Sequence, residues 1–318
     1  MELLSRARPI DGLIDAADTP SELRAKLVLA RDLRRFAARE LGLPDNGSYT
    51  RYSALDRRYV LWNVIATAAL SLEPVVSCFP VAGCVAYRGY FAPEEAEVFA
   101  AQRRAQGLDV HVAGVPAYST LGWFDDPLPS TVIHFGELEL ARLVFHELAH
   151  QVVYVADDTT FNESFAVAVE EEGLRRWVAA RQDRAGAERL AASQRHREGF
   201  RALVARTRAR LAEVYASTTS TPDKLAAKAR ILEGMQAEYR DLRASWGGFA
   251  GYDAWFARPQ NNASLASVAL YAAHVPRFHA LLHACQVDMG RFFGAVRALA
   301  AKSRDARNEA LAVVGPNC

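Results

Sequence analysis

The sequence predicts a mainly α-helical protein with a small β region, an α+β fold in which helices dominate. Three observations lead to this prediction. Residues 20–42 carry apolar side chains at helical spacing, among them Leu23, Leu27 and Leu33. Short runs rich in β-branched and aromatic residues gather between positions 73 and 135, among frequent prolines and glycines. After Gly136 the helical spacing returns and continues towards the end of the chain.

The composition excludes several classes of protein. The 318 residues are 51% hydrophobic and 24% charged, which is typical of a globular protein and excludes a disordered one. The 38 basic and 37 acidic residues give a net charge of +1, so the bulk charge predicts no nucleic-acid partner. No apolar run approaches the ~18 residues that a transmembrane helix needs.

The N-terminal segment, residues 1–72, is expected to consist of helices. Pro20 follows Thr19 and begins the helix over 20–42, because proline is favoured in the first helical turn. A loop follows over 42–48, where the sequence GLPDNGS is rich in turn-forming residues. A second helix is predicted over 52–72, where apolar residues again recur at helical spacing: Leu55, Tyr59, Leu61, Val64 and Ile65.

The second segment, residues 73–186, is expected to mix strands and helices. Its strands are predicted where β-branched and aromatic residues cluster: 85–91, 109–112 and 131–135. Its helices are predicted where apolar positions follow helical spacing: 93–106, 137–155 and 161–181.

The remaining chain is expected to be helical. Residues 187–244 predict a long helical hairpin with a turn over 217–222, and its apolar faces are expected to pack inside the protein. The C-terminal segment, residues 245–318, predicts helices over 262–284 and 287–303. We see no internal repeat and expect residues 1–318 to form a single unit.

One motif carries most of the chemical information. His146-Glu147-Leu148-Ala149-His150 is an HExxH sequence on an apolar helix. Its spacing places His146 and His150 one turn apart on the same face, so both rings can reach one zinc ion. Glu147 is rotated by about 100° from His146, where it can act as general base on a metal-activated water. The alternative is a helix whose histidines are buried and satisfied without metal.

Catalytic zinc usually takes three protein ligands, so the pair of histidines leaves one to be found. Glu163 follows His150 after a turn and the start of a new helix, and we expect it to be the third ligand of one zinc ion per chain. Two alternatives remain open. The run from Thr160 to Glu163 also fits a capping box, and Glu170 could be the ligand or an acceptor for a histidine N–H.

The sequences HELAHQ and NESFA resemble the gluzincin metallopeptidases, in which the glutamate of an NExxA helix completes the zinc site. The chain more closely resembles a family of bacterial proteins called "putative aminopeptidases". The resemblance covers most of the chain and is carried by these stretches: LPDNGSYTRY, CFPVAGCVAYRGYF, AYSTLGWFDDPL, FHELAHQ, FNESFAVAVEEEG and NNASLASVALYAAHVPRF. It implies a zincin-like metallopeptidase core around the HExxH helix.

The resemblance also implies a function. We expect a zinc-dependent peptidase, of the aminopeptidase kind, whose substrate is a peptide. The GxMEN strand with which gluzincin aminopeptidases hold a free amine does not occur here, which leaves a zinc endopeptidase or another amide hydrolase as alternatives. A catalytically inactive zincin-like binding protein of the cell envelope is a further alternative, against which the intact Glu147 argues.

Further residues are candidates for assisting catalysis. Tyr118 with Thr120, and Tyr271 with His274, could donate a hydrogen bond to an oxyanion. Arg88 could bind a substrate carboxylate, or it could form a structural ion pair. For the substrate amine we expect Glu170, on the same helical face as Glu163, with Asp125 or Asp126 as the other candidates.

The location of the protein is predicted in two ways. Residues 1–15 contain no apolar signal core, which predicts a cytoplasmic protein if Met1 is the native start. The resemblance instead implies the cell envelope or periplasm, with a lipid anchor on a preceding segment. In an oxidising compartment Cys78 and Cys84 are expected to form a disulfide; two buried free thiols are the alternative.

Overall fold

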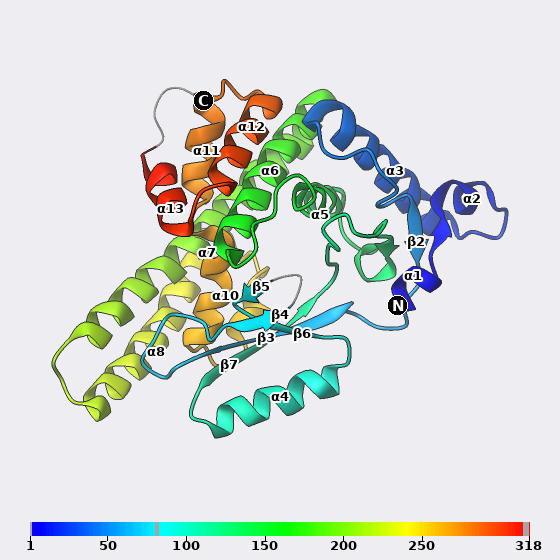
Figure 1. Cartoon of the computed structure of the whole chain (residues 1–318). Coiled ribbons are helices and arrows are strands. Elements are labelled where there is room, and N and C mark those ends of the chain that lie inside the picture. Colours follow the sequence, from blue (N-terminus) through cyan, green and yellow to red (C-terminus); the bar gives the residue numbers. More distant parts are fainter. Residues whose placement is uncertain (1, 80–82, 314–317) are drawn as a thin grey trace. The chain divides into compact units, whose positions relative to one another are not determined.

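Figure 1 shows the computed structural model of the chain, which describes residues 2–79, 83–313 and 318. The fold is mainly α-helical with a small amount of sheet, as the sequence predicts. Within these residues, no helix combines the length and the apolar character that crossing a bilayer requires.

The chain divides into two compact units, each assembled from separated stretches of sequence. The first unit contains Met1–Leu61, Gly114–Leu190 and Ala273–Cys318. The second contains Trp62–Ala113 and Ala191–Ala272. The four consecutive segments expected above divide the chain by position, whereas these units join segments that are distant in sequence.

The first unit is built on helices that share one apolar core. Its helices are α1 (Glu2–Ser5), α2 (Ile10–Asp15), α3 (Ser21–Leu41), α5 (Glu137–Ala149), α6 (Thr159–Ala180), α11 (Val275–Ala284), α12 (Met289–Ala300) and α13 (Arg304–Ala312). Helix α5 packs against α6 and α3, and α11 packs against the other side of α6 (Figure 1). Phenylalanines fill the space between them: Phe145, Phe161, Phe165, Phe278 and Phe292 are all fully buried.

A small sheet completes the first unit. Strand β2 (Arg51–Ser53) pairs antiparallel with β1 (Arg8–Pro9) and parallel with β8 (Leu128–Pro129). This pairing joins the chain after α3 to the segment that leads into α5.

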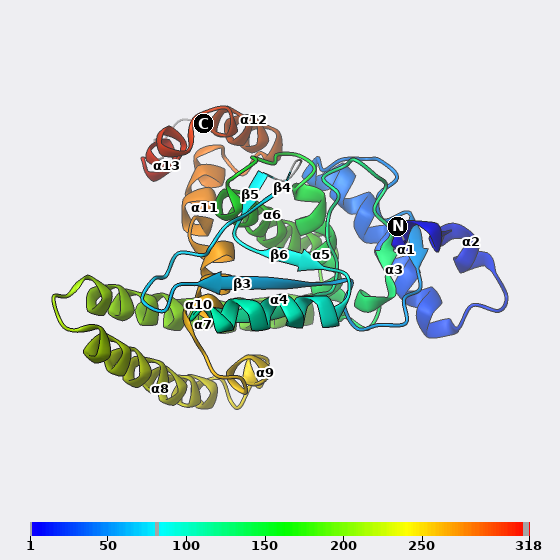
Figure 2. The same ribbon diagram turned by 60° about the horizontal axis from the view of Figure 1, so that its bottom comes forward.

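The second unit contains a sheet and the helical hairpin. The sheet has the order β6 (Arg88–Tyr90), β3 (Leu61–Thr67), β7 (Asp109–Val115), and α4 (Pro93–Ala105) runs along it (Figure 2). The hairpin consists of α7 (Arg184–Ala216), whose first turns belong to the first unit, and α8 (Thr221–Ser245). Two shorter helices follow, α9 (Asp253–Phe256) and α10 (Asn262–Ala272).

The predicted helix over 52–72 is wrong, because this stretch contains strands β2 and β3. Val64 and Ala66 pack on alanines of α4, while Ile65 faces the opposite side of the sheet and packs on Ala263 and Ala266. A strand that is covered on both faces reads as a continuous apolar run, which has no alternating pattern to separate it from a helix.

The predicted strand over 131–135 is also wrong. Residues Ser130–Val132 form a short 3₁₀ helix. The hydroxyl of Ser130 accepts from the backbone N of Leu55 at 2.8 Å, and that of Thr131 donates to the backbone O of Pro116 at 2.5 Å. These side-chain hydrogen bonds hold the segment in place of the backbone hydrogen bonds that a strand would make.

Other boundaries differ by less. The strand expected over 85–91 is two strands, β5 (Gly83–Val85) and β6. The helix expected over 137–155 ends at Ala149, and that over 262–284 is divided into α10 and α11. Helix α13 was not expected.

Both pairs of cysteines are disulfides. Cys78 and Cys84 join β4 (Ser77–Phe79) to β5, with Cα atoms 3.9 Å apart. The second bond, which the sequence did not suggest, joins Cys285 to Cys318.

Candidate metal centre

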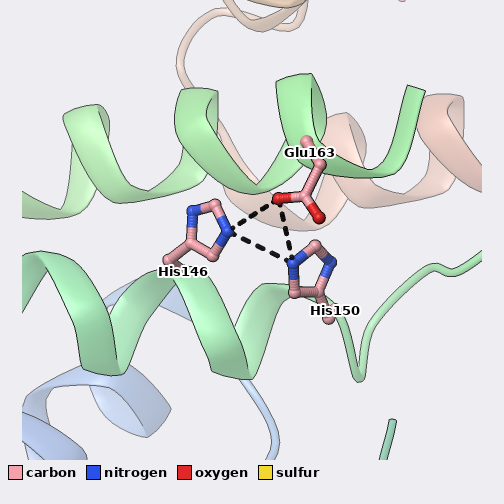
Figure 3. Close-up of side chains that lie close together, drawn as sticks. All are labelled: His146, His150 and Glu163. Carbon is pink, nitrogen blue, oxygen red and sulfur yellow. Dashed lines mark hydrogen bonds and ion pairs between the residues drawn. The ribbon is translucent and has the colours of Figure 1, made fainter. Parts of the chain in front are cut away.

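The helix of the HExxH motif is fixed by its buried face. Helix α5 begins after Gly136, whose backbone N donates to the Glu139 carboxylate at 3.0 Å. The residues that turn into the core are fully buried: Leu140, Ala141, Val144, Phe145, Leu148 and Ala149. With this face held, His146 and His150 lie one turn apart and face α6 (Figure 3).

Two polar contacts fix the start of α6. Asp158 is the N-cap, and its carboxylate accepts from the backbone N of Phe161 at 3.1 Å. The side chain of Asn162 holds the preceding loop, accepting from the backbone N of Val155 and donating to its O, both at 2.8 Å. Because Asp158 caps the helix, the capping-box alternative for Glu163 is wrong, and the carboxylate of Glu163 turns towards the histidines instead.

The three expected ligands converge on one point (Figure 3). Oε2 of Glu163 lies 3.1 Å from Nε2 of His146 and 3.6 Å from Nε2 of His150, and the two Nε2 atoms are 3.2 Å apart. Ligands at about 2.05 Å from a tetrahedral zinc ion would be roughly 3.3 Å from one another. The spacing of these atoms therefore fits an ion of that size.

The hydrogen bonds around His146 also fit a cation. Its Nδ1 lies 2.9 Å from Oε2 of Glu170, so a neutral ring carries its proton on Nδ1 and points the Nε2 lone pair at Glu163. Nε2 of His150 faces the same point. In the ion-free protein a proton of His146 bridges to Glu163, and His146, His150 and Glu163 are a buried group that could bind a metal ion in place of that proton.

The carboxylates and the histidines of the group stabilise each other's charged forms. Burial raises the pKa of Glu163, but His150 and His146 outweigh it and lower that pKa to about 2. Burial lowers the pKa of His146, but the hydrogen bonds to Glu163 and Glu170 outweigh it and hold that pKa well above its usual value. Glu163 is thus held as a carboxylate, the form that a metal requires.

Glu170 has both carboxylate oxygens occupied. Oε2 bonds to His146, and Oε1 accepts from Arg142 at 2.9 Å. These contacts match the alternative that Glu170 accepts from a histidine N–H. Its predicted role in binding a substrate amine stays a prediction.

Glu147 lies beside the group, half-buried on α5. Burial raises the pKa of its carboxyl, the charges of His146 and His150 oppose that rise, and those of Glu163 and Asp126 add to it. A carboxyl whose pKa lies above its usual value is a better proton acceptor, as a general base should be.

Two loops of the first unit lie against the end of α5. Nδ2 of Asn46 donates to Oε1 of Gln151 at 2.7 Å, and Nε2 of Gln151 donates to Oγ of Ser48 at 3.1 Å. In the second loop, the carboxylate of Asp126 accepts from the backbone N of Thr120 at 2.8 Å. Gln151, the residue that follows His150, thus holds the first loop at the end of α5.

The candidate assisting residues fall in different places. Tyr118 packs on Leu55 and Val60 in the first unit, and burial raises its pKa. Tyr271 is 38% exposed at the end of α10 in the second unit. Arg88, also in the second unit, places its guanidinium over the rings of Tyr90 and Phe99. The roles predicted for these three residues stay predictions.

Several residues of the site escaped the sequence analysis. Arg142 lies one turn before His146 on α5, and this spacing could have suggested a contact with Glu170. Asn162 and Gln151 act through backbone and side-chain contacts that no spacing reveals. Tyr49 lies in a loop, and its full burial is visible only in the structure.

A glycine brings the two ligand helices together. A Cβ on Gly173 of α6 would lie 2.6 Å from the ring of Phe145 and 2.8 Å from Leu41. Because Phe145 directly precedes His146, the bare backbone at position 173 lets α6 approach α5 closely.

Fold and site together define a mainly α-helical protein with a buried group that could bind a metal ion. Residues 1–311 match the family described as "Putative aminopeptidase", and the chain belongs to that family. The family name suggests a peptidase, with a peptide as substrate. No curated protein and no solved structure gave a match.

Proposed function

We propose that the protein is a zinc-dependent aminopeptidase whose centre is His146, His150 and Glu163. The observation that carries this proposal is the convergence of the three ligand atoms at 3.1 to 3.6 Å, with Glu147 beside them. The zincin-like arrangement of α5 and α6 belongs to the same proposal. A bound zinc ion would polarise the scissile carbonyl and make a water molecule acidic enough to attack it.

The residues of the chain have separate roles in this proposal. Glu147 takes the proton of the attacking water and delivers it to the leaving amine. Glu170, held by Arg142, keeps the ring of His146 in the orientation that presents Nε2. Tyr118 is a candidate donor to the developing oxyanion.

Recognition of a free amine needs a carboxylate that is neither ligand nor base. Both oxygens of Glu170 are engaged and Asp126 is only 2% exposed, so the exposed Asp125 is the better candidate. Burial raises the pKa of Asp126, and its charge adds to the raised pKa of Glu147.

A pair of variants tests the assignment. The purified wild type should contain about one zinc ion per chain, and Glu163→Gln should reduce this content. Glu147→Gln should keep the zinc and abolish cleavage of aminoacyl amides. Elemental analysis and a peptidase assay measure the two results, and the reverse pattern would mean that ligand and base had been exchanged.

We also propose an oxidising location, the cell envelope or periplasm. The two disulfides support it, because such bonds persist mainly in oxidising compartments.

A further inference from the structure

Tyr49 has an unusual position in the first unit. Its side chain is only 1% exposed, and its hydroxyl is a buried polar group without a hydrogen-bond partner among the described residues. Its backbone is left-handed, with φ at 59°, a conformation that is uncommon for residues other than glycine. A strained backbone and an unsatisfied buried hydroxyl are both unfavourable, and such features concentrate at functional sites.

The surrounding bonds place Tyr49 beside the end of α5. Its backbone N donates to the backbone O of Asp126 at 2.6 Å. Ser48, the residue before it, accepts from Gln151 at 3.1 Å. Gln151 directly follows His150, just beyond the end of α5 at Ala149. Tyr49 is therefore held beside the end of the helix that carries Glu147.

The electrostatic surroundings agree with this placement. Burial raises the pKa of Tyr49 well above its usual value, and the charges of Glu147 and Asp126 add to the rise. Both carboxylates therefore act on the phenol electrostatically. A phenol kept protonated in this way can only be a neutral hydrogen-bond donor or acceptor.

Of these two carboxylates, Glu147 is the one in need of a donor. Asp126 accepts from the backbone N of Thr120; burial raises its pKa, and hydrogen bonds from Thr120 and Ser119 oppose that rise. No donor to the carboxylate of Glu147 occurs among the described residues. Hydrogen bonds of a catalytic group are often long in the free enzyme and tighten when the site is loaded.

We propose that Tyr49 is a positioning residue for Glu147, and that its hydroxyl donates a hydrogen bond to one carboxylate oxygen of Glu147 in the metal-loaded protein. The other oxygen remains free to accept the proton of the attacking water. The catalytic part of this inference rests on the proposed peptidase function; the contact itself does not.

The first test is Tyr49→Phe, which removes the hydroxyl alone. We expect kcat for an aminoacyl amide to fall about 10- to 100-fold, with KM and zinc content unchanged. Tyr52→Phe, in the neighbouring strand, is the matched control and should keep wild-type kcat. Unchanged kcat in Tyr49→Phe would overturn the positioning role, as would a parallel loss of zinc, which would indicate a structural one.

A double-mutant cycle tests the contact without any activity assay. In the zinc-loaded protein, Tyr49→Phe should shift the unfolding equilibrium about tenfold towards the unfolded state when Glu147 is present. In the Glu147→Ala background the shift should be less than about twofold. Equal shifts in both backgrounds would refute the contact. If the two mutations are coupled but the wild-type protein cleaves no peptide, the proposed peptidase function is wrong and the contact between Tyr49 and Glu147 is still supported.

Discussion

His146 and Glu170 are joined by a bond of 2.9 Å between Nδ1 and Oε2. Glu170 is itself held by Arg142, so three residues from two helices form a chain that ends at the candidate metal centre. The bond selects the tautomer of His146 whose Nε2 lone pair faces Glu163. The orientation of one candidate ligand is therefore set in the ion-free protein.

This series of hydrogen bonds predicts that Glu170→Gln weakens zinc binding about 10- to 100-fold. Mutation of a residue that orients a metal ligand usually lowers metal affinity by this factor. Competition with a chromophoric chelator measures the affinity. The matched control is Glu172→Gln, two positions along α6, whose carboxylate pairs with Arg175 and Arg176 instead. Equal affinities of the two variants would contradict the orienting role of Glu170.

The aminopeptidase assignment predicts a strong preference for a free N-terminus. N-acetylation of a short peptide should reduce kcat/KM by at least ~100-fold, the loss of one charge-assisted contact worth ~2.7 kcal/mol. Chromatography of the products from paired blocked and free substrates provides the comparison. Cleavage of both at the same rate would identify an endopeptidase and would leave the metal centre unaffected.

The disulfides predict that the native protein contains no reactive thiol, because Cys78, Cys84, Cys285 and Cys318 are all paired. Thiol titration under denaturing, non-reducing conditions should give none before reduction and four after it. Four thiols before reduction, in protein taken from an oxidising compartment, would contradict both bonds.

The second unit should lose stability in acid. Burial, with the nearby charge of Arg258, lowers the pKa of His111 to about 4. Between pH ~6.5 and ~4 the unfolded chain binds a proton at this ring and the folded chain does not, so stability falls as the pH decreases through this window. The loss is at most about 3 kcal/mol, from ~1.4 kcal/mol per pH unit.

Urea unfolding of the His111→Gln variant tests this expectation. Its midpoint should decrease less than that of the wild type between pH 7 and pH 4.5. His134→Gln, at an exposed position in the first unit, is the control. An identical pH dependence of wild type and His111→Gln would show that the buried ring does not control the acid response.

The sequence predicted the ligand helices well because their signals are local. The i, i+4 spacing of His146 and His150 determines a shared face in any α-helix, and Asp158 and Gly136 bound the two helices at positions typical of caps. Glu163 could be proposed because only a short loop separates it from His150.

The remaining features depend on contacts between distant segments. Strand β3 was mistaken for a helix because α4 and α10 cover both of its faces, which removes the alternation of a typical strand. Tyr49 became a candidate only when its burial and its place beside the end of α5 were known. The bond from Arg142 to Glu170 joins two helices, and no rule of spacing within one helix predicts it.

Gly173 influences the spacing of the site residues from a distance, because it lets α5 and α6 pack closely. Ten residues separate it from Glu163, about 15 Å along α6, so it makes no contact with the ligands. Yet any side chain there would meet Phe145 and wedge the two helices apart. A shift of a few tenths of an ångström in Glu163 would favour a larger ion with longer bonds over a small one. In the proposed metal centre, the size of the ion that fits would thus depend partly on the Cβ that position 173 lacks.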